Sequence, residues 1–358
     1  MNHKLIVGIA FFSFLNGCSE VQSKNQTSVD TSFADTSFVS EGFVTKAPDS
    51  LEFVSFAASD TEKLINGDEV DITKFPAILN TTTCSAALIG PRTVVTAAHC
   101  IDNTTNQPAP AYSTAILNWF GNPYPLVCKM SADYGNRPHA GAAARGPEDF
   151  ALCAIAAASI DSLNIPEGSI NSNYRFETLD LTATYDKVEQ DVTLTGFGCT
   201  GLSPYLFLDP EDGFYKYKTN PLTAKYEKPR KLRVGATTLN KVDKTKGIAQ
   251  SYSKNDGRPV VCPGDSGGPI FAGRIDPIRP DTHSRKIIGV NSETGVTNVY
   301  QGGKYPIDWY QHSNFSLISS ASFKRMLEDF IIENNIQELC IEGYDGAQNI
   351  RRPGDCHI

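Results

Sequence analysis

From residue 64 onward, the sequence is a succession of short β-type segments separated by clusters of Gly, Pro, Asn and Asp. Segments of this length and spacing predict an all-β barrel or sandwich. One α-helix is expected near the end, because Ser320 can cap it and apolar residues recur at helical spacing from 323 to 331. The predicted strands are Phe75–Leu79, Ala86–Ile89, Thr93–Thr96, Ala115–Trp119, Phe150–Ile155, Val192–Gly196, Lys231–Val234, Pro269–Phe271, Lys286–Val290 and Phe315–Ile318.

Long loops are expected between these strands, at about 102–112, 200–230, 273–285 and 297–313. Loops carried by a rigid β scaffold are where binding and specificity commonly reside. We therefore expect these segments to shape whatever site the chain carries.

Residues 1–18 have the pattern of a secretion signal. Lys4 precedes the apolar run Leu5–Leu15, which is too short to span a bilayer, and the run is followed by Gly17 and Cys18. A small residue followed by Cys resembles a bacterial lipoprotein signal, which implies acylation of Cys18 and a mature protein held to the membrane by this lipid anchor only. The alternative is an ordinary signal peptide followed by a cysteine. Either pattern predicts export across the inner membrane, to the bacterial envelope (outer membrane or cell surface) or to the extracellular medium.

The rest of the chain divides by composition. Residues 19–63 are rich in Ser, Thr, Asp and Glu without periodicity, which predicts a flexible tether or pro-segment. A folded domain is expected over 64–335, followed by a C-terminal extension, 336–358. The net charge of −8 comes without a basic stripe, so a nucleic-acid partner is not expected.

The chain contains nine cysteines. If Cys18 carries lipid, an even number remains, which suits disulfide formation in an oxidising compartment. Counting alone leaves their connectivity open. These remaining cysteines are Cys84, Cys100, Cys128, Cys153, Cys199, Cys262, Cys340 and Cys356.

Three short stretches contain the residues most suited to chemistry. They are Thr96–Cys100 (TAAHC), Asp149–Leu152 (DFAL) and Cys262–Pro269 (CPGDSGGP). A single His or Asp is usually structural, but the third stretch is specific and follows the first two in order. Over residues 64–335 the chain resembles the chymotrypsin/trypsin-like serine peptidases, in which His, Asp and Ser follow one another in this order.

The resemblance implies two packed antiparallel β-barrels, over about 64–185 and 186–335, with a C-terminal α-helix. Between them His99, Asp149 and Ser266 would form a catalytic triad. A serine hydroxyl is a weak nucleophile until a base removes its proton, and an imidazole with a pKa of about 6.5 can accept and return it. No cofactor is expected, and the histidines lack metal-ligand spacing.

The residues around the serine have their own implied roles. The N–H groups of Gly264 and Ser266 would form an oxyanion hole, whose loss typically costs ~10²–10³ in rate. In the family, pro-segment cleavage frees an amino group that pairs with the Asp before the nucleophile. Here this implies cleavage after Lys63 and pairing of Leu64 with Asp265, although Ile or Val is usual where Leu64 stands. Alternatively, Asp265 pairs with local backbone groups.

The resemblance also implies disulfide pairings. The bridge beside His99 and the bridge that clips the Asp149 strand match the family. The pairing of Cys199 with Cys262 departs from it, because the cysteine before the nucleophile usually pairs with one downstream. The implied pairs are Cys84–Cys100, Cys128–Cys153, Cys199–Cys262 and Cys340–Cys356.

Substrate preference follows from the same resemblance. Val260 stands at the floor of the main side-chain pocket and is expected to disfavour basic side chains, because a buried cation would lack a partner there. Ser292, Glu293 and Thr294 stand in the strand that pairs with substrate. A pocket that rejects Lys could not cut efficiently after Lys63, so another peptidase is expected to activate the chain.

The favoured interpretation is therefore a monomeric secreted serine endopeptidase, made as a zymogen, that acts on proteins or peptides. One alternative is a catalytically silent trypsin-like fold that serves as a binding or adhesion module. A third reading is a hydrolase that prefers esters or a single protein target.

Overall fold

The computed structural model describes residues 64, 66–81, 83–102, 112–119, 122–135, 148–155, 176–183, 188–202, 204–219, 221–226, 228, 230–244, 246–253, 257–280, 285–354 and 356–357. The expected signal peptide with Cys18, the tether and Lys63 lie outside the described residues. In the described part, no helix is long and apolar enough to cross a membrane.

The first sheet contains six antiparallel strands in the order β2–β3–β4–β7–β6–β5. Its short strands alternate with turns, as the sequence predicted. The strands are β2 (Ile78–Asn80), β3 (Ser85–Gly90), β4 (Thr93–Thr96), β5 (Tyr112–Trp119), β6 (Asn122–Met130) and β7 (Ala151–Ile155).

The second sheet follows the order β1–β12–β9–β15–β16–β17–β14–β13, and β8 pairs with both β16 and β18. Two of its strands, β1 and β8, precede residue 185, near which the boundary between the two barrels was expected. The strands are β1 (Asp68–Glu69), β8 (Thr178–Asp180), β9 (Asp191–Gly196), β12 (Arg233–Thr238), β13 (Lys241–Asp243), β14 (Ile248–Ser253), β15 (Pro269–Ala272), β16 (Lys286–Val299), β17 (Asp308–Leu317) and β18 (Ile341–Glu342).

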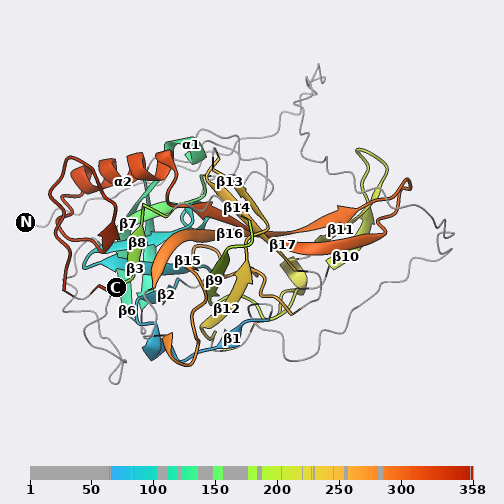
Figure 1. Ribbon diagram of the computed structural model, residues 1–358, viewed down its shortest axis with the longest axis horizontal. Helices are drawn as coiled ribbons and strands as arrows, with labels where there is room; N and C mark the ends of the chain where they lie inside the picture. The colour runs from blue at the N-terminus through green and yellow to red at the C-terminus, as the bar shows by residue number, and fades with distance from the viewer. Residues whose placement is uncertain are drawn as a thin grey trace, which may run out of the picture. The chain divides into compact units, whose positions relative to one another are not determined.

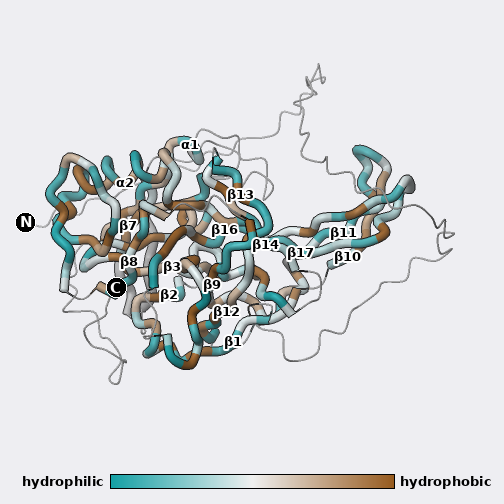
Figure 2. Tube along the Cα trace, viewed as in Figure 1, coloured by the Kyte–Doolittle hydropathy of each residue, from teal (hydrophilic) through white to brown (hydrophobic). Residues whose placement is uncertain are grey.

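The expected helix forms as α2 (Ala321–Glu333), and the Ser320 hydroxyl caps it by accepting a hydrogen bond from the N–H of Phe323. Along the helix, the hydrophobic residues of its buried face alternate with hydrophilic residues (Figure 2). The remaining helical elements are short: α1 (Ala132–Gly135), η1 (Ile72–Lys74), η2 (Ala98–Cys100) and η5 (Pro221–Thr223).

One hydrophobic cluster joins the two sheets and α2. It contains Val95 and Phe150 from the first sheet, Val290 from the second, and Phe323 and Phe330 from the helix. The rings of Phe150 and Phe323 meet edge to face, with centroids 5.0 Å apart. Because Phe150 follows Asp149 directly, this packing fixes the position at which the aspartate enters the site.

The prediction of long loops at 200–230 and 297–313 was wrong in part. Within the first segment, β10 (Pro204–Leu208) and β11 (Tyr215–Thr219) form a separate hairpin. In the second, β16 and β17 remain paired from Val299 and Asp308 inward, and β11 lies beside β16 (Figure 1). Aromatic contacts between the hairpins, such as Tyr217 with Trp309, stabilise strands that lack a simple apolar alternation.

The C-terminal extension packs into the domain. The N–H of Cys340 donates to the carbonyl of Ile89 in the first sheet, and the N–H of Leu179 in β8 donates to the carbonyl of Cys340, both at 2.8 Å. The Leu339 side chain is fully buried. The extension therefore forms part of the core between β3 and β8.

Candidate active site

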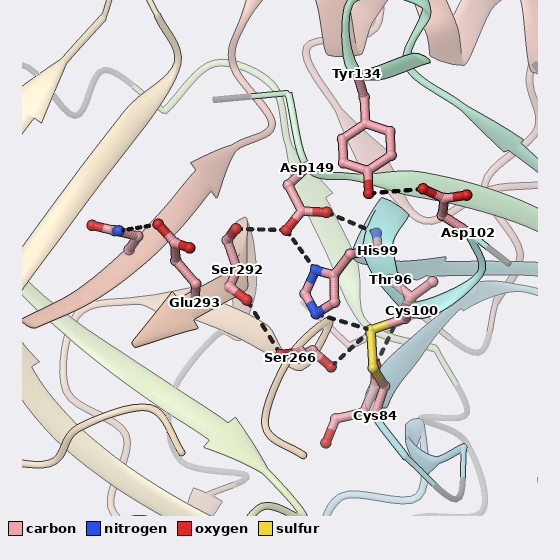
Figure 3. Close-up of polar contacts among 12 residues, drawn as sticks. Cys84, Thr96, His99, Cys100, Asp102, Tyr134, Asp149, Ser266, Ser292 and Glu293 are labelled. Carbon is pink, nitrogen blue, oxygen red and sulfur yellow. Dashed lines mark hydrogen bonds and ion pairs between the residues drawn. A yellow bond between two sulfur atoms is a disulfide. The ribbon is translucent and has the colours of Figure 1, made fainter. Parts of the chain in front are cut away.

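His99 lies in η2, directly after the buried strand β4. Its Nδ1 is 2.7 Å from Oδ2 of Asp149, and its main-chain N–H donates to Oδ1 of the same carboxylate at 2.9 Å (Figure 3). These two contacts orient the imidazole ring and leave Nε2 on the opposite side. An imidazole held in this way can exchange a proton at Nε2.

Asp149 is completely buried and lies two residues before β7. Its Oδ2 accepts a second hydrogen bond, of 2.5 Å, from the hydroxyl of Ser292 in β16. Burial alone raises the pKa of Asp149, but the charge of His99 and the hydrogen bonds from His99 and Ser292 outweigh it, so that its pKa lies below the ordinary value. Asp149 is therefore ionised at neutral pH and stabilises a protonated His99.

Ser266 lies on the other side of His99 and is 7% exposed (Figure 3). Its hydroxyl donates to the carbonyl of Ser292 at 3.2 Å, and among the described residues it makes no hydrogen bond with His99. The hydroxyl must therefore turn from Ser292 toward Nε2 before a proton can pass. A serine hydroxyl rotates readily, and such contacts often tighten only when substrate binds.

The turn that carries Ser266 needs glycine on both sides. Gly264 has φ of +103° and Gly267 has φ of +78°, in the region that side chains disfavour. A Cβ on Gly267 would lie 2.1 Å from Oγ1 of Thr96. Within the described part of the chain, the N–H groups of Gly264 and Ser266 donate no hydrogen bond, so both remain available to an oxyanion.

Asp265, directly before Ser266, is fully buried. Its two oxygens accept hydrogen bonds from the N–H groups of Gly198, at 2.7 Å, and Cys262, at 2.9 Å. Burial raises the pKa of Asp265 to about 7, although these hydrogen bonds and the charges of Arg233 and Arg230 act in the opposite direction.

The side chain of Leu64 is fully buried in a cluster with residues of the second sheet, including Val192 and Ile270. Lys63 is outside the described residues, and the intact chain carries no free amino group at Leu64.

The residues expected to bind substrate come from two segments of the chain, and these segments lie near each other. The N–H of Val261, next to Val260, donates to the hydroxyl of Ser313 at 2.9 Å, and Ser313 pairs with Thr294 across β16 and β17. Val260 is buried in a small cluster with the Cys199–Cys262 bridge and Leu202. Glu293 lines a pocket together with Ser292 and Asn314, and its Oε1 accepts a hydrogen bond from the side-chain amide of Asn314 at 2.7 Å. Val260 is not among the described residues that line this pocket.

Thr294 follows Glu293 on β16. Its hydroxyl donates to the carbonyl of His312 at 3.3 Å. The side chains of Glu293 and Thr294 thus form hydrogen bonds with residues of β17. The register of the β16–β17 pairing shifts just before them, between Asn291 and Glu293.

The described part of the chain contains four disulfides, and their pairings are those that the resemblance implied: Cys84–Cys100, Cys128–Cys153, Cys199–Cys262 and Cys340–Cys356. Sγ of Cys100 lies 3.8 Å from Nε2 of His99. Cys84, His99 and Cys100 thus place three ligand-type atoms within 4.8 Å of one another. The two sulfurs are bonded to each other, so neither is the thiolate that a metal requires.

Two features of the site escaped the sequence analysis. Ser292 was expected only to contact substrate, whereas its hydroxyl also contacts Asp149. Arg230, which belongs to none of the three motifs, lies against Gly264. No local pattern signals either contact, because each joins strands or loops that are distant in sequence.

A family model described as Trypsin matches residues 64–315, more than half of the chain. Among solved structures, the structure of Glu endopeptidase in complex with MPD aligns with a TM-score of 0.42 and 12% sequence identity, over 74% of this chain and 95% of that chain. Among curated proteins, none matches the chain significantly.

Proposed function

This chain belongs to the trypsin family, and we propose that it is an active serine endopeptidase in which Ser266 is the nucleophile. The observation that supports this most directly is the buried pair of Asp149 and His99, with Ser266 next to it and two unengaged N–H groups beside the serine. A silent binding module would not need to keep all of these groups.

In the proposed reaction His99 transfers protons, Ser266 carries the acyl group and two main-chain N–H groups stabilise the oxyanion. His99 Nε2 takes the proton of Ser266 as its oxygen attacks the substrate carbonyl, and the N–H groups of Gly264 and Ser266 stabilise the oxyanion. His99 then gives this proton to the leaving amine, which releases the first product and leaves an acyl group on Ser266. Water, activated by His99, hydrolyses the acyl group and restores the serine.

The test is intact-mass labelling with a fluorophosphonate, which reacts with an activated serine. The chain is labelled before and after cleavage of the Lys63–Leu64 bond, with Ser266→Ala as the control. A single adduct that is absent from the control is the expected result. No adduct on folded, correctly cleaved protein would contradict the proposal and favour the binding module.

We also propose that the chain is a zymogen. Cleavage after Lys63 would provide the Leu64 amino group as a partner for Asp265, whose carboxyl otherwise has only uncharged hydrogen-bond donors. The cut form is expected to label faster than the intact form. Equal labelling rates would contradict the zymogen proposal while leaving the peptidase proposal standing.

The proposed preference is for apolar over basic side chains at the cleaved bond, because Val260 offers a cation no partner. If so, another peptidase cleaves after Lys63. Rapid self-cleavage of a pro-form purified free of other peptidases would contradict this. As an exported lipoprotein the enzyme would be anchored through Cys18, which mass analysis of the mature N-terminus can test.

A further inference from the structure

The guanidinium of Arg230 lies against the loop that carries the proposed oxyanion hole. Its Nη1 is 3.2 Å from the position that a Cβ on Gly264 would occupy, and Gly198 Cα is 3.0 Å from the same position. The ring of Tyr226 holds the guanidinium from another side, with Cζ 4.6 Å from the ring centroid.

Arg230 has no anionic partner in the described structure. Its Nη1 is buried without a hydrogen bond, and neither a hydrogen bond nor an ion pair involves its other nitrogens among the described residues. Arg230 is partly buried, and it differs from the two fully buried arginines in having no carboxylate partner. Arg233 lies 3.8 Å from Glu69, although its Nη1 is likewise buried without a hydrogen bond, and Arg285 lies 2.8 Å from Glu177.

The buried carboxylate of Asp265 does not supply the missing partner. Arg230 affects Asp265 only through its charge, because both oxygens of Asp265 are occupied by main-chain N–H groups. The surrounding chain adds positive charge, since residues 225–233 contain Lys225, Lys228, Arg230, Lys231 and Arg233 with Glu227 as their one acidic residue.

Burying a cation without an acceptor is unfavourable unless a ligand later provides one. The planar, five-donor guanidinium matches a carboxylate in a bidentate contact, and a carboxylate is the anionic group that a peptide substrate can carry. Because Nη1 lies beside Gly264, such a ligand would sit next to the carbonyl under attack.

We propose that Arg230 binds a carboxylate of the substrate close to the bond that is cleaved. The carboxylate is either the side chain of an Asp or Glu flanking that bond or the terminal carboxylate of a short peptide. This inference rests on the proposed function, since it places substrate at Ser266. It adds an acidic determinant beside the apolar side chain proposed above.

If Arg230 has only a structural role, a different result is expected. If Arg230 only offsets the charge of Asp265, its removal slows the cleavage of all substrates equally. If it binds substrate, the loss is confined to substrates that carry the carboxylate.

The experiment compares matched peptides that differ by Glu or Gln at single positions on each side of one cleaved bond, and matched peptides with a free or amidated C-terminus. The rates are normalised to the fluorophosphonate-reactive fraction. The parent enzyme is expected to favour one carboxylate, and the favoured position identifies its source. Arg230→Gln should reduce this preference by about 10- to 100-fold, the range for a charge-assisted hydrogen-bonded contact, with the neutral peptides unaffected.

Lys228→Gln is the matched control, because it removes an exposed charge from the same segment and should leave the preference intact. A parent without any carboxylate preference, or an equal loss on all peptides in Arg230→Gln, overturns the proposal. Binding of the same peptides to Ser266→Ala and to Ser266→Ala/Arg230→Gln, measured by fluorescence anisotropy, decides the question even if no labelling occurs. A failure of catalysis is thereby separated from a failure of carboxylate recognition.

Discussion

The hydroxyl of Ser292 donates a 2.5 Å hydrogen bond to Oδ2 of Asp149, the oxygen that also faces Nδ1 of His99. Ser292 belongs to β16 in the second sheet, whereas Asp149 precedes β7 in the first. This contact therefore connects the two sheets through the carboxylate that orients the proposed base. A change in the spacing of the two sheets would therefore move Asp149 and change the orientation of the His99 ring.

We expect Ser292→Ala to lower kcat/KM and the rate of fluorophosphonate labelling by roughly 10-fold, because a hydrogen bond to a charged group contributes about 1.5–3 kcal/mol. Ser322→Ala is the control, since its hydroxyl is buried without a partner. An unchanged labelling rate in Ser292→Ala would contradict the role assigned to this contact.

The same variant should alter acid stability. The pKa of Asp149 is lowered in the folded chain, so its contribution to stability is present above the unfolded pKa of about 3.9 and is lost as pH falls through the folded pKa. Without Ser292 the folded pKa rises, so this contribution becomes smaller and is lost at higher pH. Urea unfolding between pH 3 and 7 measures the change, and coincident pH profiles of parent and variant would argue against it.

Gly267→Ala should destabilise the protein strongly. A Cβ there meets Oγ1 of Thr96 at 2.1 Å and the carbonyl oxygen of Ser85 at 2.4 Å, so we expect a loss of about 3 kcal/mol or more. Gly257→Ala is a close control, because it has a similar φ of +76° with nothing within 4 Å and should cost only about 1 kcal/mol. Similar losses in the two variants, measured by urea unfolding, would show that φ and not packing dominates.

The stability of the uncut chain should depend on Asp265. Burial raises its pKa to about 7, so between pH 3.8 and 7 the folded chain holds a proton that the unfolded chain has lost. Stability should then fall as pH rises through this window, by an amount on the order of 4 kcal/mol as an upper bound. In Asp265→Asn this dependence should disappear.

The measurement is urea unfolding at several pH values in a Ser266→Ala background, which prevents self-cleavage. The readout is the slope of the unfolding free energy against pH. The amide of Asp265→Asn also weakens the hydrogen bond from Cys262, but this lowers stability by the same amount at every pH and leaves the slope unchanged. Parallel pH profiles of the two proteins would contradict the prediction.

The C-terminal extension should contribute to folding through its disulfide. Replacing Cys340 and Cys356 together by Ala opens a bridge with a sequence separation of 16, which typically costs about 3 kcal/mol. Gly354→Ala lies in the same loop with nothing within 4 Å and should leave stability unchanged. A double variant as stable as the parent would mean that packing of residues such as Leu339 suffices.

The sequence by itself determined the features that depend on neighbouring residues. Short strands separated by turn residues, the helix capped by Ser320 and the glycines around Ser266 all follow from local conformational preferences. The three motifs around His99, Asp149 and Ser266 were also recognisable, and the structure brings these residues to one place.

Only the tertiary structure decided the contacts that join distant segments. The extension of β16 and β17 through a predicted loop, the hydrogen bonds of Cys340 with β3 and β8, the contact of Ser292 with Asp149 and the position of Arg230 have no local signature. Each depends on which strands pair and in which register, and a side chain's partner across a sheet is set by that pairing and not by its own neighbours in sequence.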